Sequence, residues 1–518
     1  MATHPMSAVD AAWYHMDGPA NSATVIGMLL TKLPLDFAKV REVYQHRLLA
    51  FERFRQRVVE RGIAFATPCW EDVPDFDLDQ HLHHIALPTP QDRAALNALV
   101  DDLASQPLDH TLPLWQAHVV DGVEGGSAVI TRYHHCIGDG TAMMAVMQRL
   151  YDTEPDTPAD VLPEPLPPAK QRAPHRLLAH GLDALARSAR NALAKEAPAG
   201  HEVPAPSVAV DKARLVLAGA GMLVAELLKW PDPKSPLKGD FQPRKRVAWS
   251  EPVPVSHVKA IGAPSGAKVN DVLVACMTGA LRAYLAKRGV AVNRTTVRAM
   301  VPVDLRPAER FGELGNEFGL VILDLAVAKA RTLARLAETK LRMDALKRSP
   351  EPIAMRLLLD IFGRGPKALE DLANQIFGSK ASVVMTNVAG PREPMYLAGT
   401  PIDRLMFWVP HPGRQLGMGI SILSYCGEVS LAVIADAHLV PDPETITASF
   451  NREFGRMLKS LATHAARKPV KRERAGASAT ARKPKPRTAS RHKITPTRAA
   501  PPSRPRTARS RRVAKDSR

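Results

Sequence analysis

The chain has 518 residues, with 70 Lys and Arg against 52 Asp and Glu, a formal net charge of +18. Residues 467–518 hold 19 Lys and Arg and two acidic residues, a net charge of +17, which leaves +1 for residues 1–466. A nucleic-acid-binding fold needs its basic surface on the folded body, so this distribution argues against one and makes nucleic acid an unlikely partner. At 45% apolar residues the body is long enough for two globular domains of about 150 to 230 residues each.

The four cysteines and the N-terminus indicate a cytoplasmic protein. Cys69, Cys136, Cys276 and Cys426 are scattered without metal-ligand spacing, which is typical of a reducing compartment. The first residues lack the cationic and apolar segments of an export signal, and no apolar run reaches the roughly 18 residues that span a bilayer.

The first block, residues 1–154, ends in a strand, a turn and a helix. Residues 127–133 (SAVITRY) are β-branched and aromatic, as in a strand, and the turn HHCIGDG follows. The next segment repeats apolar residues at helical spacing through Leu150, and Thr141 is a plausible N-cap. We expect an N-terminal domain here.

Residues 155–240 form a predicted linker with crossover helices. Seven prolines lie between Pro155 and Pro174, which excludes a regular helix there. Two amphipathic or apolar helices are predicted at Arg176–Lys195 and Ala213–Trp230. They pack against the body, or one face of them enters a lipid surface.

Residues 241–466 form the second predicted domain, again with mixed helices and strands. A helix is expected from Asn270 or Asp271, either of which can act as the N-cap, to Gly289. Strands at 416–424 and 429–435 flank a four-residue hairpin connection, 425–428. The fold class is therefore α/β in both blocks, whereas residues 467–518 have too few large apolar side chains to fold and should be disordered.

The cluster His134-His135-Cys136-Ile137-Gly138-Asp139-Gly140 holds the residues best suited to chemistry. An imidazole at the end of a strand can accept a proton from a hydroxyl at neutral pH and return it to a leaving group. Adjacent strand residues point to opposite faces, so only one histidine can face a substrate. For the same reason His134, His135 and Asp139 make a poor metal site, and no metal is expected. Cys136 is interpreted as a buried residue rather than a nucleophile.

HHCIGDG has the HHxxxDG pattern of the CoA-dependent acyltransferase superfamily, and further motifs follow in order. On these motifs the chain resembles the bacterial wax ester synthase/diacylglycerol acyltransferase branch over residues 7 to about 440. The motifs are SAVDAAWYHMD from Ser7, Pro113-Leu114-Trp115, Val269-Asn270-Asp271, VPVDLRP at 301–307, GNEFG at 315–319 and TNVAGP at 386–391.

The resemblance implies two chloramphenicol-acetyltransferase-like domains with mixed sheets and an active-site channel between them. It assigns the general base to His135, with His134 and Gly140 as supporting motif residues. It makes Asp139 structural, and Arg306 of VPVDLRP is its candidate partner. Asn270 stabilises a developing oxyanion or positions substrate, or it only caps a helix; both interpretations stay open.

The implied reaction is direct transfer of an acyl group from acyl-CoA, a co-substrate, to diacylglycerol, a long-chain fatty alcohol or both, without a cofactor. Such acceptors lie in membranes, so we expect peripheral contact with a membrane or lipid droplet, assisted by residues 213–230 or by the cationic tail. Alternatively the tail is a solvated extension or touches nucleic acid. A second class of function stays open: a divergent member that condenses carrier-bound chains, or a non-catalytic lipid-binding protein.

Overall fold

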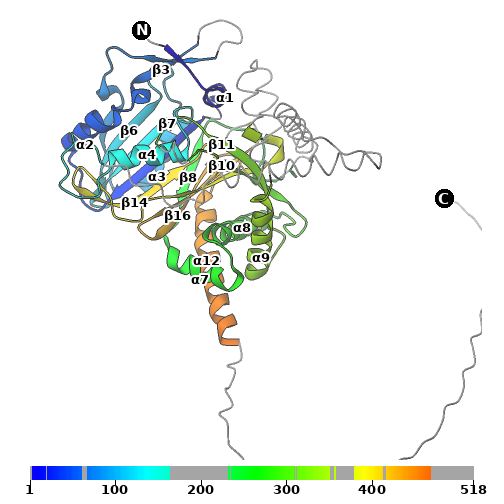
Figure 1. Ribbon diagram of the computed structural model, residues 1–518. Coiled ribbons are helices and arrows are strands. Elements are labelled where there is room, and N and C mark those ends of the chain that lie inside the picture. The colour runs from blue at the N-terminus through cyan, green and yellow to red at the C-terminus, as the bar shows by residue number, and fades with distance from the viewer. Residues whose placement is uncertain are drawn as a thin grey trace, which may run out of the picture. The chain divides into compact units, whose positions relative to one another are not determined.

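The structure, a computed structural model, describes residues 3–18, 20, 22–60, 67–163, 232–233, 235–307, 310, 312–349, 355–356, 378–411 and 416–467. All of them belong to one compact unit, Met1–Arg467 (Figure 1). The segments predicted as helices at 176–195 and 213–230 lie outside the described residues, as do most of the proline-rich stretch and the tail beyond residue 467.

The first sheet has six strands in the order β13–β14–β2–β7–β6–β5. β5 and β6 are parallel, and the other neighbours are antiparallel. The strand bounds are β2 Thr24–Thr31, β5 Leu82–Ala86, β6 Trp115–Val123, β7 Gly126–His134, β13 Tyr396–Leu397 and β14 Thr400–Trp408. β7 lies between two neighbours in the sheet, and seven of its nine residues are buried.

The second sheet has seven strands, six of them in the order β11–β10–β12–β15–β16–β8, with β9 paired to β16. β12 runs parallel to both β10 and β15, so this sheet is mixed. Its strands are β8 Lys245–Trp249, β9 Val253–Pro254, β10 Val297–Asp304, β11 Phe318–Leu325, β12 Val383–Ala389, β15 Met418–Tyr425 and β16 Glu428–Asp436. A small third sheet consists of β1 Thr3–Pro5, β4 Cys69–Asp72 and β3 Gln56–Val59.

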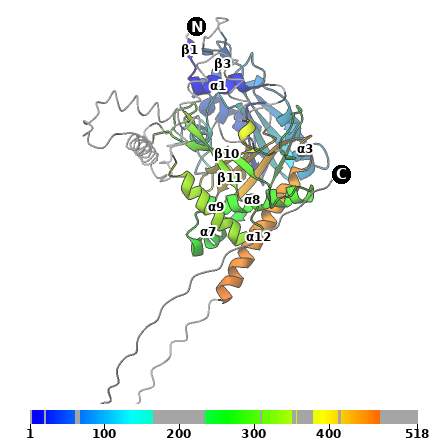
Figure 2. The same cartoon turned by 90° about the vertical axis from the view of Figure 1, so that its right-hand side faces the viewer.

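Helices cover the two large sheets. The described α-helices are α1 Ala8–Met16, α2 Phe37–Val43, α3 Arg93–Ser105, α4 Gly140–Leu150, α7 Val255–Gly262, α8 Val269–Lys287, α9 Thr332–Leu346 and α12 Pro443–Arg467. α4 packs on the first sheet, whereas α7, α8, α9 and α12 gather on the second (Figures 1 and 2). Side chains of α3 share a core with both sheets, where the rings of Trp249 and Trp408 meet edge to face, 5.8 Å apart.

The second half of the chain contributes strands to the first sheet. β13 and β14 come from the second half, yet β14 pairs with β2 of the first sheet from Ile402 to Trp408. The division into domains at 1–154, 155–240 and 241–466 therefore stays a prediction, and the pairing of β14 with β2 shows that both halves contribute to the first sheet.

The predicted starts of two helices are wrong. Asp139, not Thr141, is the N-cap of α4: its carboxylate accepts the Ala142 N–H at 2.9 Å. α8 begins at Val269 with Lys268 at the N-cap, so neither Asn270 nor Asp271 caps it. Asp271 instead accepts the Lys268 N–H from the third helical position, one half of a capping box.

The hairpin connection is also shorter than predicted. β15 and β16 extend through Tyr425 and Glu428, and only Cys426 and Gly427 remain in the loop. Their φ angles are +47° and +79°, as in the two-residue turns that match the twist of paired strands.

Within the described ranges, α8 is the helix long and apolar enough to cross a membrane by length and composition. Of its apolar window, 72% is buried in this protein, against the second sheet and α12. It is therefore the core helix of the second half.

Candidate active site

The motif turn joins the end of β7 to the start of α4. His134 is the last residue of β7, and the chain turns through residues 135–138 before α4 begins at Gly140. A Cβ on Gly138 would lie 2.9 Å from that of Ala142, so the close approach of turn and helix requires glycine there. The predicted strand, turn and helix are all present, and their order brings the motif to the interior.

His135 lies in a closely packed pocket and is 8% exposed. Its ring stacks on Trp13 of α1, with the centroids 3.9 Å apart and the planes 9° from parallel. Phe318 of β11 packs against it at 6.0 Å. Its Nδ1 lies 2.9 Å from Oδ1 of Asn316. The ring is thus fixed by side chains from both halves of the chain.

Burial lowers the pKa of His135 below its usual 6.5, an effect that the negative charge of Asp139 partly offsets. Burial disfavours the charged form because the low-dielectric interior solvates an imidazolium poorly. The ring is consequently neutral at neutral pH, which is the form that can accept a proton.

His134 points elsewhere and has other partners. It is fully buried, and its Nδ1 accepts the Cys136 N–H at 3.1 Å. Its Nε2 lies 3.9 Å from Asp17, which is hydrogen-bonded to His110. Burial lowers the pKa of His134 to about 4. The two histidines therefore point in different directions, and His134 lies close to Asp17, directly after the end of α1.

Asp139 connects the motif with the second half of the chain. One carboxylate oxygen caps α4, and the other accepts from Nη2 of Arg306 at 3.0 Å and from the Glu317 N–H at 2.8 Å. Both side chains of the ion pair are buried. Arg306 also donates to the main-chain oxygens of Gly315 and Glu313. The expected pairing of Asp139 with Arg306 is present.

The GNEFG segment is held against the motif by main-chain contacts. The Gly315 N–H donates to Ile137 O at 3.1 Å, and the Asp139 N–H donates to Gly315 O at 3.3 Å. Gly315 has a φ of +104°, a conformation that favours glycine. Asn316 follows directly, so these contacts determine where its side chain lies relative to His135.

Asn270 lies at the exposed start of α8, and its Oδ1 accepts from Nδ2 of Asn387 at 2.7 Å. Asn387 belongs to the TNVAGP motif. Two of the sequence motifs therefore meet, but the contacts described for Asn270 do not join it to His135. A role for Asn270 in stabilising an oxyanion stays a prediction.

Cys136 is completely buried, and burial raises the pKa of its thiol well above the usual range. A thiol that stays protonated is a poor nucleophile. This agrees with its interpretation as a buried residue of the motif.

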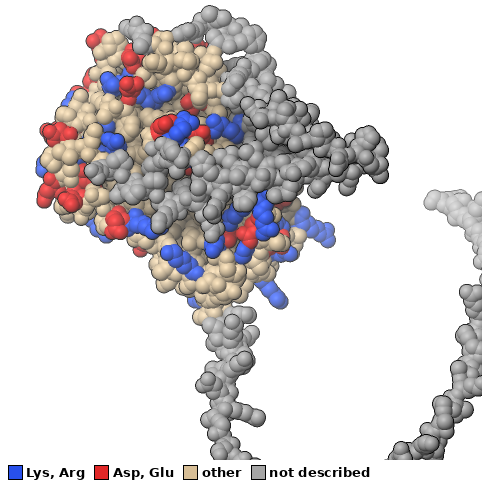
Figure 3. Space-filling model, in the orientation of Figure 1, with Lys and Arg blue, Asp and Glu red and all other residues tan. Residues whose placement is uncertain are grey.

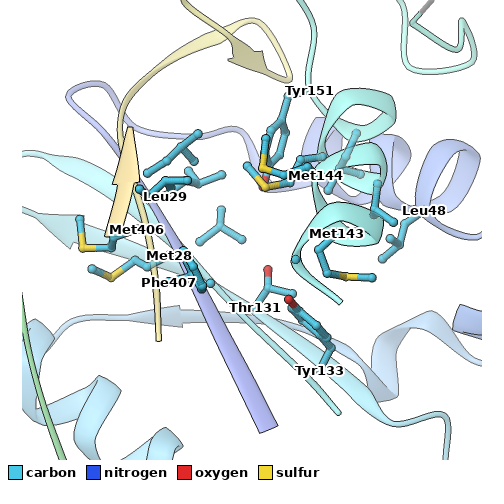
Figure 4. Close-up of a pocket in the computed structure, with 18 of the residues that line it drawn as sticks. Met28, Leu29, Leu48, Thr131, Tyr133, Met143, Met144, Tyr151, Met406 and Phe407 are labelled. Carbon is cyan, nitrogen blue, oxygen red and sulfur yellow. The ribbon is translucent and has the colours of Figure 1, made fainter. Parts of the chain in front are cut away.

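An apolar cavity begins beside the motif (Figure 4). It lies between α4 and the strands β2, β7 and β14, and its lining reaches Tyr133 and Gly140 on either side of the turn. The lining has no charged residue; its polar groups are the hydroxyls of Thr131 and three tyrosines, and five of its residues are methionines. Methionine is a flexible side chain that adapts to elongated apolar ligands.

Trp13, Asn316 and Asp10 are site residues that the sequence analysis did not single out. Each lies in a motif that carries the family resemblance, SAVDAAWYHMD or GNEFG, but nothing in the local spacing assigns any of them a role. Only the folded chain brings positions 10, 13, 135 and 316 together.

We predict that Asp139→Ala destabilises the protein by about 3 kcal/mol, because it leaves the Arg306 charge buried without its partner and removes the cap of α4. Thermal or denaturant unfolding measures the loss. Asp36→Ala is a matched control, since Asp36 caps α2 through the Ala38 and Lys39 N–H groups at an exposed position; it should cost about 1 kcal/mol. Equal losses in the two variants would contradict a structural contribution from the ion pair.

The chain is similar to known proteins over most of its length. The profile of the wax ester synthase/diacylglycerol acyltransferase catalytic domain matches residues 6–273, and that of the family's C-terminal domain matches residues 314–458. A "Putative diacyglycerol O-acyltransferase" of Mycobacterium tuberculosis is 28% identical over 485 residues, 90% of this chain and 99% of that one. A second M. tuberculosis protein, a "Probable diacyglycerol O-acyltransferase", is 29% identical over 422 residues, 79% and 88% of the two chains.

Solved structures show the same fold. The wax ester synthase/diacylglycerol acyltransferase from Marinobacter aquaeolei VT8 has a TM-score of 0.63 at 20% identity, covering 89% of this chain and all of that one. The first condensation domain of the calcium-dependent antibiotic synthetase has a TM-score of 0.54 at 17% identity, covering 89% and 96%. These likenesses confirm the α/β fold with mixed sheets. With a catalytic-domain profile over more than half of its length, the chain belongs to the wax ester synthase/diacylglycerol acyltransferase family.

Proposed function

We propose that this acyltransferase moves a long-chain acyl group from acyl-CoA to the hydroxyl of a diacylglycerol or a fatty alcohol, with His135 as general base and without a cofactor. The observation that carries the proposal is the position of the apolar cavity directly beside the turn that holds His135. Gly140 and Met143, in the first turn of α4, line this cavity, and Figure 4 labels Met143. An uncharged, methionine-rich cavity suits an acyl chain whose reactive end lies at the motif.

The proposed reaction needs one base and no covalent enzyme intermediate. Nε2 of His135 accepts the proton of the acceptor hydroxyl as the oxygen attacks the thioester carbonyl carbon. The carbon–sulfur bond then breaks, and the leaving thiolate takes the proton from the imidazolium, which restores the neutral base. Free CoA and an ester are the products.

Diacylglycerol is the acceptor that we propose first. The curated relatives described above are named as diacylglycerol acyltransferases, and the family name includes wax ester synthesis as well. The family name therefore covers both acceptors, and the preference for diacylglycerol is our proposal.

We predict that purified protein given palmitoyl-CoA and dioleoylglycerol forms one ester for each CoA thiol that it releases. With hexadecanol as the acceptor, the same reaction should be slower. His135→Ala should lower turnover by a factor of about 10² to 10⁴, the usual contribution of a general base. His257→Ala, at an exposed position on α7, is the matched control. A folded wild-type protein that forms neither ester would favour a non-catalytic lipid-binding protein or an enzyme that takes carrier-bound chains.

The cavity gives a second test. Leu29 lines it on β2, where it pairs with Val129, five residues before the end of β7. This position is about 16 Å along the strand from His134, so it is far from the motif. We predict that Leu29→Trp shortens the cavity and lowers kcat/KM at least about tenfold for palmitoyl-CoA but not for butanoyl-CoA.

Leu33→Trp is the control for added ring volume, because Leu33 is exposed just beyond the end of the same strand. Equal losses with both acyl donors in Leu29→Trp would indicate damage to the fold instead of a shorter acyl site.

We also propose a cytoplasmic protein that contacts lipid surfaces peripherally through its cationic tail. The four cysteines are free thiols, as a reducing compartment favours. On the described face of the body in Figure 3, acidic and basic side chains are interspersed, whereas residues 467–518 carry a net charge of +17. A tail of this charge is attracted to anionic lipid, at about 1 kcal/mol for each cation that reaches the surface.

Removal of residues 468–518 should preserve turnover with detergent-dispersed diacylglycerol and weaken binding to phosphatidylserine vesicles. The full chain should bind these vesicles less tightly as salt rises and should bind phosphatidylcholine vesicles weakly, because salt screens exposed charges. Co-sedimentation measures both. Unchanged vesicle binding after truncation would contradict a role of the tail in lipid contact.

A further inference from the structure

The side chain of Asn316 lies between His135 and a buried carboxylate. Its Oδ1 is 2.9 Å from Nδ1 of His135, and its Nδ2 donates to His135 O and to Oδ1 of Asp10, each at 2.8 Å. The Asn316 N–H donates to the same Asp10 oxygen at 3.0 Å. All three residues are buried, with Asp10 4% and Asn316 6% exposed.

The partners of the amide determine which end is nitrogen. A main-chain carbonyl can only accept hydrogen bonds, so the amide atom that faces His135 O must be the NH₂ group. The reversed amide would direct its oxygen at two other oxygens. The oxygen of Asn316 therefore faces His135, and it can only accept.

An acceptor at Nδ1 requires that Nδ1 carry the proton. A neutral imidazole has a single N–H, so Nε2 is then the unprotonated nitrogen. We propose that Asn316, oriented by Asp10, is the positioning residue that holds His135 as its Nδ1–H tautomer and leaves Nε2 free to take the acceptor's proton. This inference rests on the proposed function in that it makes Nε2 the base of that reaction.

Helix α1 supplies both supports of the ring. Asp10 and Trp13 are three residues apart on α1, and hence on one face of the helix. Trp13 stacks on the imidazole and sets its plane, whereas Asp10 sets the amide that meets its edge. The start of α1 is itself held by Ser7, whose hydroxyl accepts the Asp10 N–H at 3.1 Å.

A neutral amide has a different effect from a carboxylate in this position. A carboxylate on Nδ1 would stabilise the imidazolium strongly, whereas the amide oxygen orients the ring with only a partial charge. The Asp10 carboxyl, whose pKa is raised by burial, contacts Asn316 and stays one group away from the ring. The arrangement thus fixes the tautomer and lets burial keep the pKa of His135 low.

The tautomer can be measured without turnover. In protein labelled with ¹⁵N-histidine, the His135 signals, identified by their loss in His135→Gln, should show a protonated Nδ1 and an unprotonated Nε2 at pH 7.5. Asn316→Ala should move the ring toward the Nε2–H form. The main-chain carbonyl of His135 is also close to the ring. If the tautomer is unchanged in Asn316→Ala, that carbonyl and not Asn316 holds the proton on Nδ1, and the proposal is overturned.

Kinetics test the consequence for catalysis. Asn316→Ala should lower kcat on the order of 100-fold, within the contribution of a positioned general base, while the KM for acyl-CoA changes less than about threefold. Asn451→Ala is the matched control, because Asn451 of α12 also donates from Nδ2 to a main-chain oxygen, that of Glu251 at 2.9 Å, in an exposed contact. A kcat loss no larger than that of Asn451→Ala would overturn the proposal.

Asp10 offers a graded test that does not depend on removing Asn316. Both bonds from Asn316 go to one oxygen of Asp10, and an amide oxygen can accept them too. Asp10→Asn should therefore retain at least about tenfold more kcat than Asp10→Ala, with the wild-type tautomer. Equal losses in the two variants would show that charge, not orientation of the amide, matters at this position and would overturn the role given to Asp10.

The same measurements separate this inference from the proposed reaction. If His135→Ala keeps full activity while Asn316→Ala shifts the tautomer, His135 is not the base, although Asn316 positions its ring. If His135→Ala is inactive and Asn316→Ala changes neither tautomer nor kcat, the base assignment stands and the positioning role of Asn316 falls.

Discussion

The buried ion pair between Asp139 and Arg306 is the constraint on which the arrangement of the site depends. Asp139 belongs to the first half of the chain, and Arg306 follows β10 of the second sheet. In a low-dielectric interior neither charge is tolerated alone, so the two segments must meet for the chain to fold. The same carboxylate starts α4, which forms a wall of the apolar cavity, and binds the Glu317 N–H beside Asn316. One side chain thus helps to position both the apolar cavity and the segment that contacts His135.

Burial lowers the pKa of the motif's two histidines and raises the pKa of its cysteine, so all three side chains are neutral. It keeps the imidazoles of His134 and His135 neutral and the thiol of Cys136 protonated. The charge in the motif is therefore carried by Asp139, which is neutralised by Arg306. A neutral imidazole near an apolar cavity can receive a proton from an alcohol without first losing one to water, as the proposed transfer to a lipid-like acceptor requires.

Much of the fold and part of the site could be predicted from the sequence, for reasons that are local. The strand, turn and helix around HHCIGDG follow from residue pattern, and so does the hairpin near Gly427. The predicted N-cap of α4 was wrong because aspartate and threonine are both good N-cap residues, so the sequence allows Asp139 or Thr141. Asp139 is also held by Arg306 and Glu317 from the second half of the chain, which the local sequence does not report. The roles of Asp10, Trp13 and Asn316 could not be predicted, because their meaning arises from contacts across about 120 to 306 positions of sequence. No periodicity or spacing within one segment reports such contacts.

The placement of β13 and β14 in the first sheet has a consequence for how this protein can be divided. A fragment that ended before residue 240 would keep β2 but lose its neighbour β14, and the first sheet would then present an unpaired edge together with the apolar side chains of Met28 and Leu29. Such a fragment is an aggregation hazard and not an independent module. The halves must therefore be synthesised, folded and inherited together, and recombination between relatives within this region would have to carry residues 396–408 along with the N-terminal half to give a folded enzyme.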